Sequence, residues 1–174
     1  MARYAAAVES QTAQASGTPV TTTFNGYFAA IVGGTTGFTL RRVQLGVRTT
    51  STPTSQQQTI GIYRQSVRVS AASGLTGIST TTGNKLDPYS ATSGISGIDI
   101  TTATTVGGTT PVGPTINGPL YRVTFNTQST LDLPFELLEQ FRVSNATTDG
   151  IAFVNLGSAL PASHLFTLTA EWEE

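Results

Sequence analysis

The chain has 174 residues, enough for one domain that buries roughly 70% of its unfolded surface, whereas two domains would be cramped. Its net charge of −1 provides no basic excess to neutralise a phosphate backbone, which argues against a nucleic-acid partner. The lack of cysteine excludes disulfides, thiolate metal sites and cysteine nucleophiles. No apolar run reaches the roughly 18 residues of a membrane span, and we expect no signal peptide because Glu9 interrupts a short apolar opening.

Hydroxyl side chains supply most of the polar surface. Only 11% of the residues are charged, against about 25% in a typical domain, whereas Thr and Ser account for 32 and 15 residues. Thr is β-branched and favours strands, and 18 Gly and 8 Pro interrupt the chain at frequent intervals. This composition predicts an all-β protein with many turns.

The first half of the chain predicts four strands, at residues 3–9, 20–32, 38–50 and 59–69. Alternation in the first strand directs Tyr4, Ala6 and Val8 toward the core and Arg3 to the opposite face. In the second strand we interpret Asn25–Gly26 as a β-bulge. In the third strand the inward residues are Val43, Leu45 and Val47, and the outward residues include Arg42 and Arg48.

The alternation is lost between residues 71 and 118, which are rich in Ser, Thr and Gly. An unstructured loop of that length is unusual in a compact domain, so we expect a long excursion over the surface that contains short strands, for example at 96–102. Two further strands are predicted at 120–126 and, at a sheet edge, 131–135. The spacing of Phe135, Leu138 and Phe141 predicts one or two helical turns with these side chains inward.

The end of the chain carries the strongest strand pattern. Residues 150–157 are apolar on both faces, which is typical of a central strand covered on both sides. Residues 163–172 alternate, with Phe166, Leu168, Ala170 and Trp172 on one face. We interpret the two segments as an antiparallel hairpin at the centre of the fold, and we predict that Phe153, Val154, Phe166 and Leu168 are buried together.

The elements together predict a single domain over residues 1–174, an antiparallel β-sandwich of about eight strands with 71–118 as a loop-rich insertion. The jelly roll and the immunoglobulin-like sandwich both fit this pattern. The number of strands and the long excursion favour a jelly-roll-like fold.

No constellation of side chains predicts a catalytic, cofactor or metal site. His164 is the only histidine, and we interpret it as an exposed or capping residue. Glu136 and Glu139 could share a helix face, which is more typical of a solvated surface than of acid–base chemistry. The spacing of the aspartates does not match a calcium loop, so they are interpreted as turn and edge residues: Asp87, Asp99 and Asp132.

Two other features are weak signals. Asn145-Ala146-Thr147 matches a glycosylation acceptor, but Asn145 is better explained as a turn residue. Arg41 and Arg42 are adjacent in a strand, so they should point to opposite faces and could not both belong to one flat basic patch.

The two ends of the chain resemble small structural proteins of tailed bacteriophages, especially phages of actinobacteria. The resemblance rests on the opening Met-Ala-Arg-Tyr-Ala-Ala-Ala-Val-Glu-Ser, on Phe-Thr-Leu-Arg-Arg-Val-Gln-Leu-Gly-Val, and on a close of the form Phe-Val-Asn-Leu-Gly…Leu-Thr-Ala-Glu-Trp-Glu-Glu. It covers strands of both halves and leaves residues 71–118 unmatched. Such head decoration (cement) or minor capsid proteins imply a sandwich fold, a place on the virion, self-association, often as trimers, and binding to the outer face of the major capsid protein.

We therefore expect a capsid decoration protein that bridges capsomers, with no enzymatic activity, no cofactor, no nucleic acid and no membrane among its partners. A tail-fibre or baseplate module that binds host glycan is the alternative, which exposed aromatics such as Tyr89 would favour. The expected interface residues, between subunits or with the capsid, are Arg3, Tyr4, Val8, Arg42, Arg48 and Trp172.

The terminal segments carry a second expectation. We predict a homo-oligomer, a trimer, in which at least one terminal segment contacts a neighbouring chain, because ordering backbone costs about 1–2 kcal/mol per residue and termini usually fray. The alternative is that Tyr4 and Trp172 pack inside their own sandwich on neighbouring strands.

Overall fold

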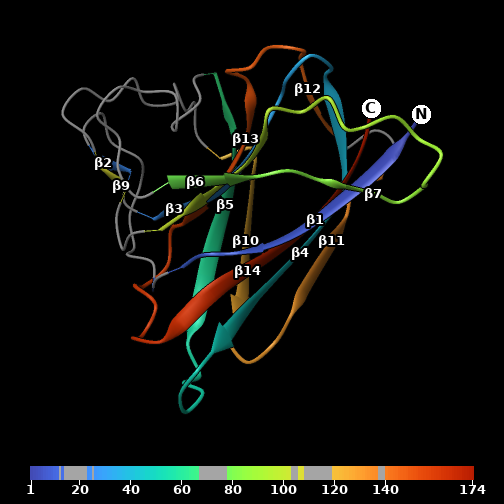
Figure 1. Ribbon diagram of the computed structural model, residues 1–174. Coiled ribbons are helices and arrows are strands. Elements are labelled where there is room, and N and C mark those ends of the chain that lie inside the picture. The colour runs from blue at the N-terminus through green and yellow to red at the C-terminus, as the bar shows by residue number, and fades with distance from the viewer. Residues whose placement is uncertain are drawn as a thin grey trace.

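The protein is an antiparallel β-sandwich, as the sequence predicts (Figure 1). It is represented by a computed structural model that describes residues 1–11, 13, 23–24, 26–66, 78–102, 106–107, 119–136 and 140–174. Within these ranges there are strands, turns and loops but no helix.

Two six-stranded sheets form the two layers. The first, the β14 sheet, has the order β11 (Leu131–Pro134), β4 (Phe38–Thr49), β14 (His164–Glu173), β1 (Arg3–Glu9) and β7 (Asn84–Lys85), with β12 (Phe141–Val143) also paired to β4. The second, the β13 sheet, has the order β10 (Tyr121–Asn126), β5 (Gln57–Gln65), β13 (Gly150–Asn155), β3 (Tyr27–Val32), β8 (Gly97–Thr101) and β6 (Ile78–Thr81). A separate pair joins β2 (Thr23–Phe24) to β9 (Val106–Gly107).

Most predicted strands are confirmed within a few residues. The first has the predicted bounds, and β4, β8, β10 and β11 match the predictions at 38–50, 96–102, 120–126 and 131–135. β5 matches the first part of the prediction at 59–69, whose residues 67–69 lie outside the described residues. Of the predicted strand at 20–32, residues 20–22 and Asn25, the first residue of the interpreted bulge, lie outside the described residues. The described part is divided into β2 and β3, and Gly26 between them is in a turn with φ of 82°. The predicted helical turns are wrong at Phe141, which begins β12, while Leu138 lies outside the described residues.

The strand pairing is nested. In the β14 sheet β1 pairs with β14 and β4 pairs with β11, and in the β13 sheet β3 pairs with β13 and β5 pairs with β10. Among these eight strands the early ones therefore pair with the late ones, and the two halves of the chain cannot form separate cores.

The predicted hairpin between the last two strands is wrong, although both strands are central as expected. β13 pairs with β3 and β5, whereas β14 pairs with β1 and β4 in the other sheet. A hairpin loop has about two to five residues, and the longer connection at 156–163 instead crosses between the sheets. It ends at Ser163, whose φ of 67° lies in the left-handed region.

The core between the sheets is aromatic at its centre. Phe28 of the β13 sheet stacks on Phe166 of the β14 sheet with ring centroids 4.5 Å apart, and Phe153 lies 6.3 Å from Phe28. Leu168 belongs to the same buried cluster. Val154 is buried too, but on the other face of β13 with Tyr27 and Tyr63, so the predicted four-residue cluster holds for three of its members.

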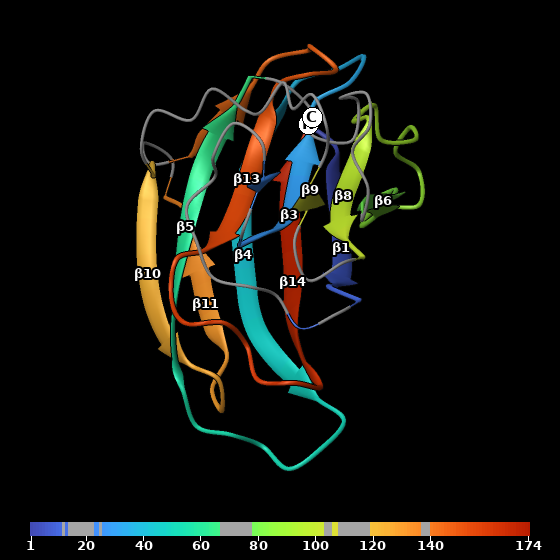
Figure 2. The same ribbon diagram turned by 90° about the vertical axis from the view of Figure 1, so that its left-hand side faces the viewer.

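The insertion contributes strands to both sheets, so its described parts do more than cross the surface. β8 and β6 extend the β13 sheet beyond β3, and β7 extends the β14 sheet beyond β1. Every residue of β8 is buried. The insertion thus closes one side of the sandwich, and the opposite side is bordered by β10 and β11 (Figure 2).

Replacing Phe166 by alanine is expected to lower the free energy of unfolding by about 3–5 kcal/mol, because it leaves a cavity beneath Phe28. Urea unfolding should show this loss. Leu165→Ala is the matched control, because Leu165 is the adjacent residue on the outer face of the same strand and is only partly buried. Equal losses in the two variants would contradict the assignment of faces.

Deleting residues 1–8 is expected to impair folding itself. β1 is an inner strand between β14 and β7, and its removal would expose the β14 edge and the side chains of Trp172 and Leu168. Soluble yield and the cooperativity of thermal unfolding measure this effect. A truncated chain that unfolds with the native transition would contradict it.

Candidate functional site

The outer face of the β14 sheet gathers a large share of the protein's charge. The residues of this charged face are Arg3, Arg41, Arg42, Arg48, Glu9, Asp132, Glu171 and Glu173. Three of the predicted interface residues lie on it, namely Arg3, Arg42 and Arg48. The charged face is therefore the candidate interaction surface.

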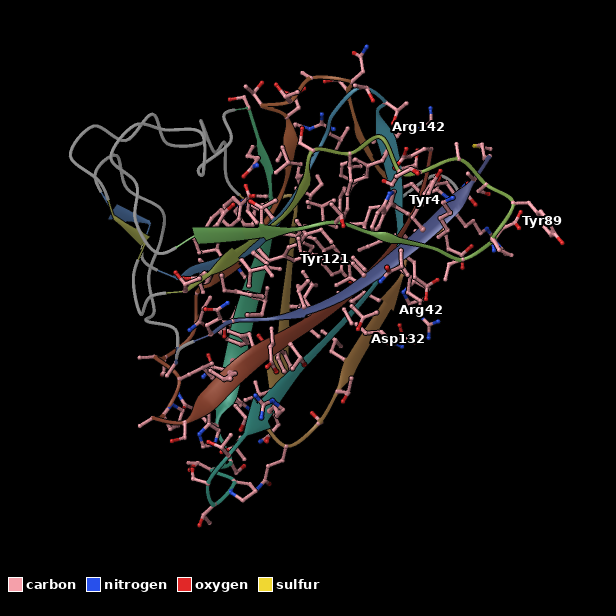
Figure 3. The ribbon with its side chains drawn as sticks, in the orientation of Figure 1. Tyr4, Arg42, Tyr89, Tyr121, Asp132 and Arg142 are labelled. Carbon is pink, nitrogen blue, oxygen red and sulfur yellow. The ribbon has the colours of Figure 1, made fainter. Side chains whose placement is uncertain are left out.

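The charges are arranged as three ion-paired groups. Arg48 of β4 reaches over β14 to Glu9 of β1 with two hydrogen bonds of 2.8 and 3.0 Å. Arg42 donates two hydrogen bonds of 2.8 and 2.7 Å to Asp132 of β11, beside which it lies in Figure 3, and it lies 3.5 Å from Glu171. These contacts tie together all the long strands of the sheet.

The third group is the most buried. Glu173 accepts a hydrogen bond of 3.0 Å from Arg3 and a second one from Arg41, and its side chain is only 6% exposed. The hydrogen bond from Arg41 lowers the pKa of Glu173, and Arg3 acts in the same direction. Hydrogen bonds from Arg48 and Arg42 likewise lower the pKa of Glu9 and Asp132.

A β-bulge brings Arg41 and Arg42 to the same face, so the prediction that they point to opposite faces is wrong. Glu171 pairs with Arg42 and Trp172 with Leu40, which leaves Arg41 as the extra residue. The inward positions accordingly change from Phe38 and Leu40 to Val43 and Leu45. This change from even-numbered to odd-numbered apolar positions is visible in the sequence and could have revealed the bulge.

Small side chains cover the middle of the charged face. Ala7, Thr167 and Thr169 line a shallow depression of about 390 Å³ between the Arg48–Glu9 pair and the charges at the other end. A second hollow of about 310 Å³ lies at that other end, lined by Arg3, Arg41, Arg42, Leu86, Pro134, Phe135, Glu171 and Trp172. A flat surface with fixed charges around small residues is suited to contact with another protein surface.

The other three predicted interface residues point into the sandwich. Tyr4 and Trp172 are paired neighbours on β1 and β14, and their rings stack with centroids 6.0 Å apart. Both are almost completely buried, and Val8 packs against the same core. The alternative expectation, packing within their own sandwich, is the arrangement found for Tyr4 and Trp172, which present almost no surface to a partner, whereas Val8 is only partly buried.

The terminal segments are held by their own chain, which removes the reason for expecting a neighbour to order them. The N–H of Ala2 donates to the carbonyl of Glu174 and the reverse bond also forms, both at 3.1 Å. The Glu174 carboxylate also accepts hydrogen bonds from Trp172, Thr36, Gly94 and Ser93. Burial raises the pKa of Glu174, but these hydrogen bonds outweigh burial and lower it.

His164 is buried and has a structural role. Its Nε2 accepts a hydrogen bond from the N–H of Thr54 at 3.2 Å, and Nδ1 lies 3.1 Å from the carbonyl oxygen of Ala162. Since a carbonyl only accepts, these contacts define a neutral ring protonated on Nδ1. The ring therefore connects β14 to the β4–β5 loop beside a polar cleft of about 360 Å³.

The predicted acidic candidates lie apart from one another. The Asp87 carboxylate accepts the Tyr89 N–H at 3.0 Å and so caps a turn, and Asp99 is buried with a hydrogen bond of 2.8 Å from Thr80. Glu136 is exposed, while Glu139 lies outside the described residues. The described ranges contain no group of three His, Cys, Asp or Glu side chains placed to hold a metal.

Comparison with known proteins does not identify the chain. No protein-family model matches it, and no curated protein or solved structure matches it. Within its described part the chain has no helix with the length and hydrophobicity needed to cross a bilayer.

Glu173→Gln is expected to destabilise the fold by about 1–3 kcal/mol at pH 7, because a buried charged acceptor of two guanidinium donors is lost. Folding lowers the pKa of Glu173, so its contribution is present above the unfolded pKa and is lost as the pH falls through the folded pKa. The stability difference from wild type should therefore shrink below about pH 4.5. Urea unfolding at several pH values measures it.

Glu171→Gln is the matched control on the same strand, because Glu171 is partly exposed and 3.5 Å from its partner. We expect Glu171→Gln to change the free energy of unfolding at pH 7 by less than about 1 kcal/mol. An effect as large as that of Glu173→Gln would contradict the claim that burial and its two arginine donors make Glu173 more important for stability than Glu171.

Proposed function

We propose that the sandwich is a jelly roll and that the protein is a structural virion protein, which decorates the outer face of a phage head and stabilises it by bridging capsomers. The nested pairing carries this proposal. β1, β14, β4 and β11 lie side by side in one sheet, and β3, β13, β5 and β10 in the other. When β12 and the insertion strands β6, β7 and β8 are set aside, each sheet has four antiparallel strands. Two such sheets with long connections are the pattern of the jelly roll, which is common in viral capsid proteins and also in lectins.

The charged face supports the same proposal. Its four arginines and four acids are mutually paired, so the face carries fixed charges in equal number and small side chains between them. Because its charges balance, such a face does not strongly attract partners of one net charge. It instead favours a partner surface with a complementary arrangement of charges, which gives the contact a defined orientation and specificity. We propose that it is the surface that meets the major capsid protein.

A tail-fibre or baseplate module is the second candidate, and one observation favours it. Tyr89 is 95% exposed at the tip of a loop that is held by the Asp87 carboxylate, and it projects away from the sandwich (Figure 3). Leu86 in the same loop is 53% exposed. Exposed aromatic rings on ordered loops are suited to stacking on sugar rings.

Copy number distinguishes the two candidates. A decoration protein should be present at on the order of hundreds of copies per virion, because it follows the symmetry of the shell, whereas a tail module should be present at a few copies. Gel densitometry of purified virions against the major capsid protein measures the ratio. A ratio typical of a tail component would overturn the decoration proposal.

Ala7→Glu is expected to weaken binding to undecorated heads at least tenfold, because it places bulk and charge at the centre of the charged face. Thr148→Glu is the matched control, because Thr148 is exposed in the turn between β12 and β13. Co-sedimentation with heads measures both variants after their thermal unfolding has been shown to match wild type. Equal binding by the two variants would show that the contact with the head lies on another surface of the protein.

A further inference from the structure

The edge strand β10 is open along one side. Among the described residues its only strand partner is β5, and it forms the outer boundary of the β13 sheet in Figure 2. Leu120 and Tyr121, at its start, are 45% and 44% exposed, and Arg122 and Thr124 are exposed as well. An exposed strand of this kind is a template for pairing with another strand.

The direction of the backbone groups follows from the pairing with β5. Thr127 donates its N–H to the carbonyl of Gln56 at 2.9 Å, and this pair continues the register in which Phe125 faces Gln58. In an antiparallel ladder, hydrogen-bonded and non-hydrogen-bonded pairs alternate. The odd residues of β10 therefore bond to β5, and Arg122 and Thr124 direct their N–H and C=O groups away from the sheet.

The other described edges are shorter or protected. β11 has four residues, ends in Pro134 and carries an ion-paired Asp132. β7 has two residues and β6 has four. β10 has six residues, with no proline and no bulge. A short strand, a proline and a bulge each normally block edge-to-edge association, and β10 has none of these three; its one charged residue is Arg122.

The sequence of β10 is symmetric in chemical type. From Tyr121 to Phe125 it reads aromatic, polar, valine, polar, aromatic. A strand of this kind is complementary to an antiparallel copy of itself centred on Val123. We propose that β10 pairs with β10 of a second copy about a two-fold axis at Val123, so that the β13 sheets of two molecules form one continuous sheet.

Three independent features select this register. It places Arg122 opposite Thr124 of the second copy, which joins the residues whose backbone groups point outward. It sets Tyr121 beside Phe125 of the second copy, an aromatic cross-strand pair. It also avoids the opposition of two Arg122 side chains, which a register centred on Arg122 would create.

The second copy fits this edge better than an unrelated strand, because its own β10 supplies all three features at once. A single strand pair is smaller than the roughly 800 Å² per partner of a standard interface, so the dimer should be weak. The inference goes beyond the proposed function, since the contact forms in the purified protein and requires neither a head nor a tail.

A cysteine cross-link tests the register directly. The chain has no cysteine, so a disulfide in Val123→Cys can only join two molecules. In the proposed dimer the two Val123 residues face each other as a non-hydrogen-bonded pair with Cα atoms about 4.5 Å apart, within the range of a disulfide. Val123→Cys should therefore cross-link under mild oxidation at least tenfold faster than Thr148→Cys, a control in an exposed turn.

Arg122→Cys is the register control, because its copies would lie diagonally apart rather than opposite each other. Faster cross-linking of Arg122→Cys than of Val123→Cys would overturn the proposed register. Cross-linking of Val123→Cys at the rate of Thr148→Cys would overturn self-pairing and leave the edge to a different partner.

A charge test gives a second, non-covalent readout. The proposed dimer contains two symmetric contacts between Arg122 of one copy and Thr124 of the other. Thr124→Glu would place a carboxylate opposite Arg122 in both contacts and should lower the dissociation constant of the dimer about two- to thirtyfold, whereas Thr124→Lys should raise it to a similar extent. Both substitutions remove the same hydroxyl contact to Thr59, so they are matched within the monomer. Sedimentation equilibrium should show opposite changes; unchanged association in both variants would overturn the proposal.

Discussion

The pairing of β1 with β14 is the contact on which the rest of the structure depends. Seven residues of β1 pair in register with β14, from Arg3 with Glu173 to Glu9 with Thr167. Its inner side carries the Tyr4–Trp172 stack, and its outer side carries the Arg3–Glu173 ion pair. Because the partners come from opposite ends of the chain, the sheet cannot be completed until the whole sequence is present.

The end of the β1–β14 pair that carries Tyr4 and Glu174 also positions the insertion. Glu174 lies just beyond β14 and receives hydrogen bonds from Gly94 and Ser93 of the insertion and from Thr36 of the β3–β4 turn. The hydroxyl of Tyr4 donates to the carbonyl of Ala91 at 3.1 Å. Two strands that form the centre of one sheet therefore also hold the loop that carries Tyr89, so the exposed tip has a rigid base. Weakening the β1–β14 pair would loosen the charged face and this loop together.

Alternation in the sequence predicts which side of a strand is buried, and here it was sufficient for most of the long strands and for the faces of β1 and β14. Alternation says nothing about which strand pairs with which. The apolar pattern of β13 and β14 is the same whether they pair in a hairpin or face each other across the core, and only the crossing at 156–163 decides between these arrangements. For the same reason Tyr4 and Trp172 looked like surface anchors, since their partnership depends on a register set by two distant segments.

The charged face was only half visible in the sequence. Arg3, Arg42 and Arg48 could be identified as outward residues, whereas Arg41 could not, because the bulge was not predicted. The acids that neutralise the arginines come from β1, β11 and β14 and are brought close by the sheet order alone. The chain contains nine basic and ten acidic residues, and four of each meet on this one face. A count of charged residues cannot show that eight of them gather on one face. It also does not show that hydroxyl side chains supply much of the polar surface elsewhere.

The charged face and the β10 edge could each bind a partner at the same time. The charged face belongs to the β14 sheet, whereas the free edge belongs to β10 of the other sheet. An antiparallel pair of edge strands is related by a two-fold axis perpendicular to the sheet, so both copies turn the same face of the continuous sheet toward the same side. The two charged faces would then point in one direction, toward a common partner surface. Two weak contacts held in this way act as one bivalent contact, and its strength depends on the spacing of the sites rather than on either contact alone. A symmetric shell would offer repeated sites of that kind, so an edge that gives only a weak dimer in the purified protein would contribute more strongly on a particle.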